Sequence, residues 1–185
     1  MKLPFPYTRP AVAVFTSLAL GASSAVANGI YMDIERKDGS RIEGGSQVSD
    51  YKGQIALTEL SQSLWSDNCS CCSASLSASK KPDASSTELY KRALTGENFE
   101  QVTIAFVEGQ ETGEPNKYLE MELEGASIAT MDTSFSGNAQ WGGRSEHLTI
   151  GFSGITWTSW ENGKKQTQQW QMPEDQRESE CSSAE

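Results

Sequence analysis

In Lys117-Tyr-Leu-Glu-Met-Glu-Leu-Glu124, three apolar residues, Leu119, Met121 and Leu123, alternate with three glutamates. A period of two is that of a β-strand with one face buried and the other face in water. Two further stretches, Phe99–Val107 and His147–Trp157, carry a similar alternation. The apolar phase changes at Gly125 and again at Gly154, which is typical of a bulge or a bend. We therefore predict a mainly β protein with two long, bent strands that curl into a barrel or a sandwich.

The rest of the chain gives weaker signals. Gly29–Glu35 alternates like a strand, whereas Ile55–Trp65 has a spacing that fits either a strand or a helix. Ser66–Ser79 is rich in Ser, Cys and Ala, and we expect a loop that runs into a short strand. Residues 161–185 contain several Gln and many charged residues, a composition that favours a flexible polar tail.

One short helix is predicted, from about Ser86 to Thr95. Ser85 can cap its N-terminus, and Glu88 three residues later completes a capping box. Gly96 stands where a C-terminal cap glycine belongs. The apolar stripe of this helix consists of Leu89, Ala93 and Leu94.

The N-terminus has the organisation of a secretory signal peptide, Met1 to Ala27. Lys2 and Arg9 form a basic start, a short apolar run follows, and Ala25-Val-Ala27 is a small-residue cleavage motif. The predicted cut falls between Ala27 and Asn28. The apolar run is about half of the ~20 residues that a membrane-spanning helix needs. A buried N-terminal helix is the alternative, and three early prolines argue against it. We expect export, to the periplasm or to the medium.

The chain is acidic, with a net charge of −10. The signal segment holds two of the positive charges and no acidic residue, so residues 28–185 carry −12. Binding to nucleic acid or to anionic lipid depends on Lys and Arg, so neither is an expected partner. With no second long apolar segment, stable membrane insertion is not expected. We assign residues 28–160 to one folded β domain and residues 161–185 to the tail.

Four cysteines follow the signal segment: Cys69, Cys71, Cys72 and Cys181. Outside the cytoplasm an even number favours disulfides, and three pairings are open. One pairing would tie the tail to the loop, and another would link two protomers. A metal site is the alternative, but the spacing is tighter than that of the usual Cys pairs and no His is near. We therefore expect neither a metal nor another cofactor.

Few polar clusters have the residue types of a reactive site. Ser145, Glu146 and His147 resemble the members of a hydrolase triad, but neighbours on a strand point to opposite faces and cannot converge. A second cluster shares one strand face: Glu120, Glu122 and Glu124. It could hold a divalent cation, and the alternative is a solvated face. Trp141, in a Gln-Trp-Gly-Gly loop, is weak support for a sugar site. We assign no catalytic residue.

The order of these pieces resembles the Hcp family, the haemolysin-coregulated proteins of type VI secretion. The matching stretches run from Tyr31 to about Trp157 and include Ile42-Glu-Gly-Gly-Ser, Asp50-Tyr-Lys-Gly-Gln-Ile55, Ser85 to Gly96, Phe99-Glu-Gln-Val-Thr-Ile-Ala-Phe, Lys117-Tyr-Leu-Glu-Met-Glu-Leu-Glu-Gly-Ala-Ser-Ile and Glu146-His-Leu-Thr-Ile-Gly-Phe. The collinear set carries the resemblance, since no single motif decides it.

The resemblance implies a small, partly open β-barrel of two curved sheets with one short α-helix. It also implies a non-enzymatic protein that forms a homohexameric ring, with rings that stack into a tube or carry effector cargo, and with other type VI secretion components as partners. It places the loop by which one ring grips the next at Ser66, Asp67, Asn68, Cys69, Ser70, Cys71, Cys72 and Ser73. A different class of protein stays open: an exported, disulfide-bonded monomeric β-domain that binds a protein or a glycan.

Overall fold

The computed structural model describes residues 28–66, 72–109, 115–135 and 143–173. Within these residues the chain forms nine strands: β1 (Gly29–Glu35), β2 (Ile55–Ser66), β3 (Cys72–Lys80), β4 (Gln101–Gly109), β5 (Pro115–Glu124), β6 (Ser127–Phe135), β7 (Arg144–Gly151), β8 (Gly154–Glu161) and β9 (Lys164–Gln171). One α-helix, α1 (Ser86–Thr95), lies between β3 and β4, and a 3-10 turn (Ser49–Tyr51) precedes β2. The prediction of a mainly β fold with one short helix is confirmed.

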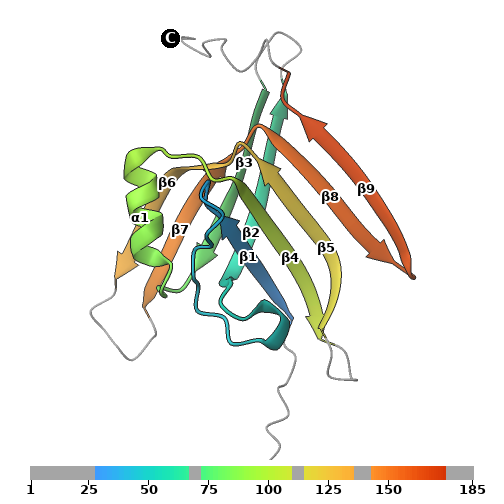
Figure 1. The fold of residues 1–185 in the computed structure, drawn as a ribbon, viewed down its shortest axis with the longest axis horizontal. Helices are drawn as coiled ribbons and strands as arrows, with labels where there is room; N and C mark the ends of the chain where they lie inside the picture. The colour runs from blue at the N-terminus through green and yellow to red at the C-terminus, as the bar shows by residue number, and fades with distance from the viewer. Residues whose placement is uncertain (1–27, 67–71, 110–114, 136–142, 174–185) are drawn as a thin grey trace, which may run out of the picture.

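The strands form one antiparallel sheet in the order β6-β7-β3-β2-β1-β4-β5-β8-β9 (Figure 1). The sheet does not close on itself, so β6 and β9 are its two edges. It curves strongly, and its two halves contribute side chains to one core instead of forming two separate sheets. This open, curved arrangement is the partly open barrel that the family resemblance implies, built from one sheet.

A long, bent hairpin gives the sheet its curvature. β5 and β6 are two parts of one limb, β7 and β8 are two parts of the other, and β5 pairs with β8 while β6 pairs with β7. The first limb bends at Gly125, whose φ of 60° is a conformation that glycine adopts without strain. At the bend of the second limb, the Ser153 N–H donates to the Glu124 carbonyl at 3.0 Å. The two predicted bends are therefore confirmed. They allow one half of the hairpin to pair with β4 and the other half with β3.

The core lies between the two halves of the sheet. Its buried side chains occupy the inward positions of the strands and include Met32, Ile34, Ile55, Leu76, Val102, Ile104, Leu123, Leu148, Ile150 and Ile155. Leu89 of α1 joins this cluster. Leu94, predicted on the same stripe, is 88% exposed. Leu94 is five residues after Leu89, and at about 100° per residue it lies roughly 140° around the helix from Leu89, outside the contact face.

The N-terminus of α1 differs from the predicted capping box. Ser85 has helical backbone angles, φ −73° and ψ −22°, and its side chain makes no cap hydrogen bond. Asp83 holds this end of the helix instead, because its Oδ1 accepts from the Ser85 N–H at 3.0 Å and from the Ser85 hydroxyl at 2.5 Å. Glu88 forms an ion pair with Arg36. The C-terminal prediction is confirmed: Gly96 has a φ of 65°, and its N–H donates to a carbonyl of the last turn.

Two stretches contain more strand than the sequence predicts. Ser66–Ser79 is predicted as a loop that runs into a short strand; the strand is present, but β3 begins at Cys72 and pairs with both β2 and β7, so the strand is longer and the loop shorter than expected. β9 pairs with β8 along its whole length, so the prediction of a flexible polar tail is wrong for residues 164–171. Neither strand has an alternation of large apolar and polar residues. Backbone pairing with neighbouring strands holds each of them in place. The segment Met1 to Ala27 lies outside the described residues.

Gly44 provides a test of how the loop before β2 packs on that strand. A Cβ atom at Gly44 would lie 2.4 Å from the Gln54 carbonyl oxygen and 2.6 Å from the Ile55 Cα. These are backbone atoms that cannot rotate away, so we expect Gly44→Ala to lower the free energy of unfolding by about 2–3 kcal/mol, a magnitude typical of overpacking.

Urea denaturation of residues 28–185 measures this loss. Gly151→Ala is the matched control, because a Cβ atom at Gly151 meets nothing within 4 Å. We expect the control to change stability by less than about 0.5 kcal/mol. Equal losses in the two variants would contradict the close packing at Gly44.

Candidate functional site

A buried ion pair joins β3 to β7. Lys80, the last residue of β3, is the register partner of Glu146 in β7, and both side chains are buried. The Lys80 Nζ lies 2.6 Å from the Glu146 Oε2. Both residues are in phase with buried apolar neighbours, Ala78 and Leu148. In the sequence, the signal for this pair is a charged residue at a position where the strand alternation predicts an apolar one. When Glu146 is considered only as a member of a triad, the ion pair is not identified.

The loop after β3 and the start of α1 complete the surroundings of this pair. The Lys80 Nζ also lies 2.9 Å from the Asp83 Oδ1 and donates to the Ser86 Oγ at 3.2 Å. The Ser86 hydroxyl donates to the Glu146 Oε2 at 2.9 Å. The second oxygen of Asp83 accepts from the Gly45 N–H at 2.8 Å. The buried cation therefore has two carboxylates and a hydroxyl as partners, as a charge removed from water requires.

Tyr90 extends the network to β6. Its hydroxyl donates to the Glu146 Oε1 at 2.5 Å and lies 2.8 Å from the Thr133 Oγ1. Burial raises the pKa of the Glu146 carboxyl, but hydrogen bonds from Lys80 and Tyr90 outweigh it and hold that pKa below its usual value. The hydrogen bond to Glu146 raises the pKa of the Tyr90 hydroxyl. These hydrogen bonds anchor the helix to the sheet. Because solvent does not reach Lys80 or Glu146, the pair itself offers no site to a substrate.

The residues of the supposed triad lie on two faces of β7. Glu146 points inward to Lys80, whereas His147 is exposed on the outer face. The His147 Nδ1 lies 2.9 Å from the Ser79 Oγ, and its Nε2 lies 3.3 Å from the Ser145 Oγ. Among the described residues, the histidine ring hydrogen-bonds to two hydroxyls and to no carboxylate, and this geometry does not orient it as a catalytic base.

The acidic residues of β5 are held by separate partners. Glu120 forms an ion pair with Lys117, and the Glu122 Oε1 accepts from the Gln101 Nε2 at 3.3 Å. In the described part of the chain, no group of three or more His, Cys, Asp or Glu side chains is placed to hold a metal ion. The geometry gives the face of Glu120, Glu122 and Glu124 no metal-binding arrangement.

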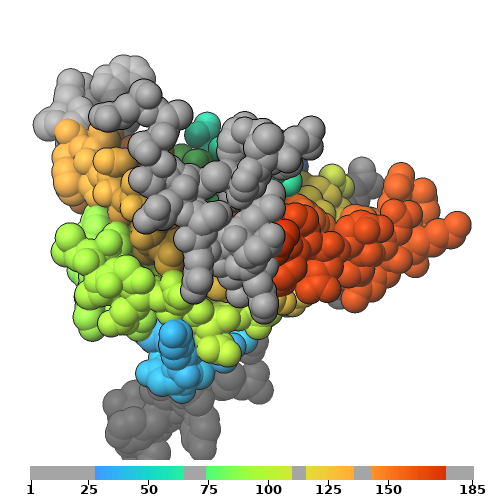
Figure 2. Space-filling model, turned by 90° about the horizontal axis from the view of Figure 1, so that it is seen from above, coloured from blue at the N-terminus to red at the C-terminus, as the bar shows by residue number. Residues whose placement is uncertain are grey.

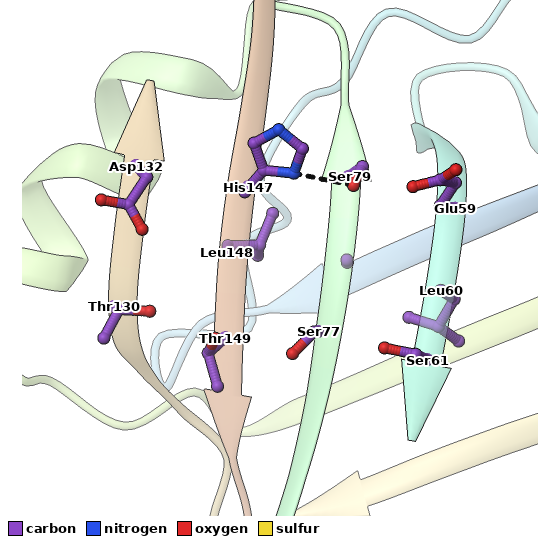
Figure 3. A pocket seen from close by; sticks show the side chains of 11 residues that line it. Glu59, Leu60, Ser61, Ser77, Ser79, Thr130, Asp132, His147, Leu148 and Thr149 are labelled. Atoms are coloured by element: carbon purple, nitrogen blue, oxygen red, sulfur yellow. Dashed lines mark hydrogen bonds between the residues drawn. The ribbon is translucent and has the colours of Figure 1, made fainter. Parts of the chain in front are cut away.

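A polar groove lies on the outer face of β6, β7, β3 and β2 (Figure 3). Strand register places two rows of side chains straight across these four strands. The first row is Asp132, His147, Ser79 and Glu59, and the second row is Thr130, Thr149, Ser77 and Ser61. The groove has a volume of about 450 Å³, and no Lys or Arg lines it. Sequence reasoning missed it, because the rows join residues from four strands and exist only once the register is known.

The β8–β9 hairpin projects from the body of the molecule (Figure 2). Nearly all side chains of β9 are exposed, and the outer edge of this strand has no neighbour among the described strands. Two lysines lie over the ring of Trp160: the Nζ of Lys117 is 4.8 Å from the ring centre and that of Lys165 is 5.9 Å from it. At the opposite edge of the sheet, Phe135 at the end of β6 is 72% exposed. The sheet thus presents two different open edges.

Comparison with known proteins assigns the family. The family model described as type VI secretion system effector, Hcp, matches residues 31–160, well over half of the chain. The chain belongs to the Hcp family. No curated protein matches it. Solved structures of Hcp proteins share its fold. Hcp1 of E. coli EAEC 042 has 20% identity and a TM-score of 0.66, with 78% of this chain and 99% of that chain covered.

Two further Hcp structures agree with this fold. Hcp1 of Salmonella typhimurium has 20% identity and a TM-score of 0.65, and the match covers 79% of this chain and 95% of that chain. The secreted protein Hcp3 of Pseudomonas aeruginosa has 19% identity and a TM-score of 0.63, with 78% and 99% covered. At these identities the likeness shows the fold alone, and the family model carries the assignment.

Several residues predicted for this Hcp protein lie outside the described part of the chain. These are Cys69, Cys71 and Cys181, Trp141, Ala27 on one side of the cleavage point, and residues 67–71 of the supposed ring-stacking loop. The ends of that loop are strand residues, with Ser66 paired to Cys72. Asn28 precedes β1, and its Oδ1 accepts from the Gly109 N–H at 2.9 Å. None of the described helices has both the length and the apolar composition that crossing a bilayer requires.

The buried ion pair predicts a large loss of stability when its cation is removed. In Lys80→Met, the buried Glu146 and the half-buried Asp83 would lie beside an uncharged side chain, so we expect a loss of about 3–5 kcal/mol in the free energy of unfolding. Lys81→Met is the matched control because Lys81 is exposed, and we expect it to change stability by less than about 0.5 kcal/mol. Urea denaturation of both variants decides, and a small effect at Lys80 would show that the pair is not a structural anchor.

The same pair predicts an acid-sensitive fold. Burial raises the pKa values of Glu146 and Asp83, but their hydrogen bonds to neighbours such as Lys80 outweigh this and hold both below the ordinary values of 4.5 and 3.8. A lowered pKa in the folded state contributes stability that is fully present above the ordinary pKa and is lost as pH falls through the folded pKa. We expect stability to fall steeply below about pH 4.5.

Glu146→Gln removes one of these titrating groups and should flatten the decline between pH 5 and pH 3, measured by urea denaturation. The exposed Glu100→Gln serves as the control and should keep the steep decline. Parallel curves for wild type and Glu146→Gln would refute this assignment.

Proposed function

We propose that this chain is a non-enzymatic ring subunit of the type VI secretion type, with the hexamer as its assembled state. Family membership supports the role, and the open sheet supplies the physical reason for assembly. An unpaired strand edge exposes backbone N–H and C=O groups that readily pair with another chain. The single observation that carries the proposal is the pair of different open edges, β6 and β9.

Two different edges favour a head-to-tail contact. If the β9 edge of one protomer meets the β6 end of the next, every copy uses the same two surfaces, and such heterologous contacts close into a ring when the rotation between copies fits. The projecting β8–β9 hairpin is suited to reach a neighbour because nearly all side chains of β9 are exposed. The number six, the stacking of rings and the carriage of cargo come from the family.

We also propose that Met1 to Ala27 is removed on export. A mature chain that begins at Asn28 would act in the periplasm or in the medium. Ser66 to Ser73 would then contribute to contacts between rings, and Cys69, Cys71, Cys72 and Cys181 would be free to form disulfides in an oxidising compartment.

Native mass spectrometry of the protein recovered from cells tests the assembly. We expect a ring of six copies at ~10 μM, with each copy beginning at Asn28, and rings visible by electron microscopy. A monomer at that concentration would contradict the ring and would favour the alternative, an exported monomeric β-domain that binds a protein or a glycan.

A pair of proline variants tests the role of the β9 edge. Successive N–H groups of a strand point to opposite sides, so either Gln166→Pro or Thr167→Pro removes a donor from the free edge only. Whichever of the two variants removes the free-edge donor should keep the wild-type urea midpoint as a monomer and should reduce the fraction of rings at least tenfold. The other variant should lose stability through the β8 pairing. If both variants assemble like wild type, the β9 edge is not the contact.

A further inference from the structure

We propose that the polar groove on the outer face of β6, β7, β3 and β2 binds a basic, extended polypeptide segment. This inference deepens the proposed cargo role and rests on it for its purpose. The groove itself lies within one chain, so its binding can be tested separately from ring formation. The argument combines the volume of the groove, the identity of its side chains and the spacing of its charges.

Two carboxylates stand at opposite ends of one row. Glu59 of β2 and Asp132 of β6 are exposed, and no ion pair or hydrogen bond joins either side chain to another described residue. By contrast, Glu120 on β5 forms an ion pair with Lys117 of the same strand. The two groove carboxylates are therefore available to an external cation.

The side chains between these carboxylates in the two rows are polar. His147 and Ser79 complete the first row, and the second row consists of hydroxyl residues (Figure 3). Hydroxyls both donate and accept hydrogen bonds, which suits the alternating N–H and C=O groups of an extended backbone. A site for a compact small molecule is usually walled by apolar and aromatic side chains. Only Leu60, Ala78 and Leu148 among the lining residues are apolar, and no Phe, Tyr or Trp lines this groove.

The charge of the groove determines which sign of charge a ligand can carry. The groove has two carboxylates and no Lys or Arg, in a chain of net charge −10. An anionic ligand such as nucleic acid or a phosphorylated peptide would meet only repulsion from the side chains that carry full charge. Lys and Arg side chains would gain charge-assisted hydrogen bonds to the carboxylates. The observations favour a polypeptide that carries such cations.

Spacing makes the proposal specific. Glu59 and Asp132 are separated by three gaps between neighbouring strands, or about 14 Å at roughly 4.8 Å per gap. An extended chain rises about 3.4 Å per residue, so two cations four residues apart are separated by nearly the same distance and project to the same side. A segment with Lys or Arg at positions i and i+4, lying across the strands, would reach both carboxylates at once.

Fluorescence anisotropy with a labelled Lys-Ser-Gly-Ser-Lys peptide tests this site. The protein is the mature chain, residues 28–185, at low ionic strength. We expect Glu59→Gln and Asp132→Asn each to weaken binding about two- to five-fold, and the double variant about ten-fold, as expected for exposed ion pairs. Raising the salt to 0.5 M should weaken binding to wild type more than binding to the double variant.

A double variant outside the groove is the matched control. Asp50→Asn with Glu100→Gln changes the net charge by the same amount at two other exposed positions and should leave binding within two-fold of wild type. A peptide with its two lysines adjacent should bind more weakly than the spaced peptide, because it cannot reach both carboxylates.

Three results would overturn the proposal: no binding to wild type at low salt, equal losses in groove and control variants, or spermidine binding as tightly as the peptide, which would assign the site to a free polyamine. Native mass spectrometry of the groove variants separates this outcome from a failure of assembly. Rings that form but do not bind the peptide would reject the groove and leave the ring intact as a proposal.

Discussion

The buried Lys80–Glu146 pair is the constraint on which the rest of the sheet depends. A shift of one residue in the β3–β7 register would turn one of these charges to the outer face and leave the other buried without its partner, at a cost of several kcal/mol. The pair therefore specifies a single register. The same network reaches α1 through Ser86 and Tyr90, so the helix is docked by the interaction that aligns the strands.

The outer face of the sheet follows from that inner constraint. Since side chains alternate along a strand, the register that buries Lys80 and Glu146 must expose their neighbours Ser79 and His147 side by side. The polar groove is thus the reverse side of the anchor, and its charge distribution is set by residues that take no part in holding the fold. Such residues can vary without loss of stability, which is the condition for adapting a surface to a ligand.

The sequence predicts the elements whose signals lie in neighbouring residues, such as strand alternation, glycine bends and the end of the helix. The alternation of β4, β5 and β7, the bends at Gly125 and near Gly154, and the end of α1 at Gly96 could all be read from neighbouring residues. The full length of β3 and the existence of β9 could not, because one is built largely from Ser and Ala and the other is polar on both faces, and each is held as a strand by pairing with its neighbours. The anchor and the groove join residues far apart in the sequence, so neither could be assembled before the register was known, although Glu146 in an apolar phase was a usable signal.

Electrostatics limits how copies of this acidic chain can meet. Each protomer repels its neighbours at long range, so a stable contact has to lie where the local charge is least negative or has to bury enough surface to overcome the repulsion. The β8–β9 hairpin meets the first condition, because Lys117 and Lys165 both lie over the ring of Trp160 near its tip. It meets the second in part, because Trp160 offers a large ring and the β9 edge offers unpaired backbone groups. The groove, with its unpaired Glu59 and Asp132, is the least suitable face for a contact between copies and the most suitable one for a cationic ligand. The two proposals therefore use different surfaces for a single reason, the uneven distribution of charge over one open sheet.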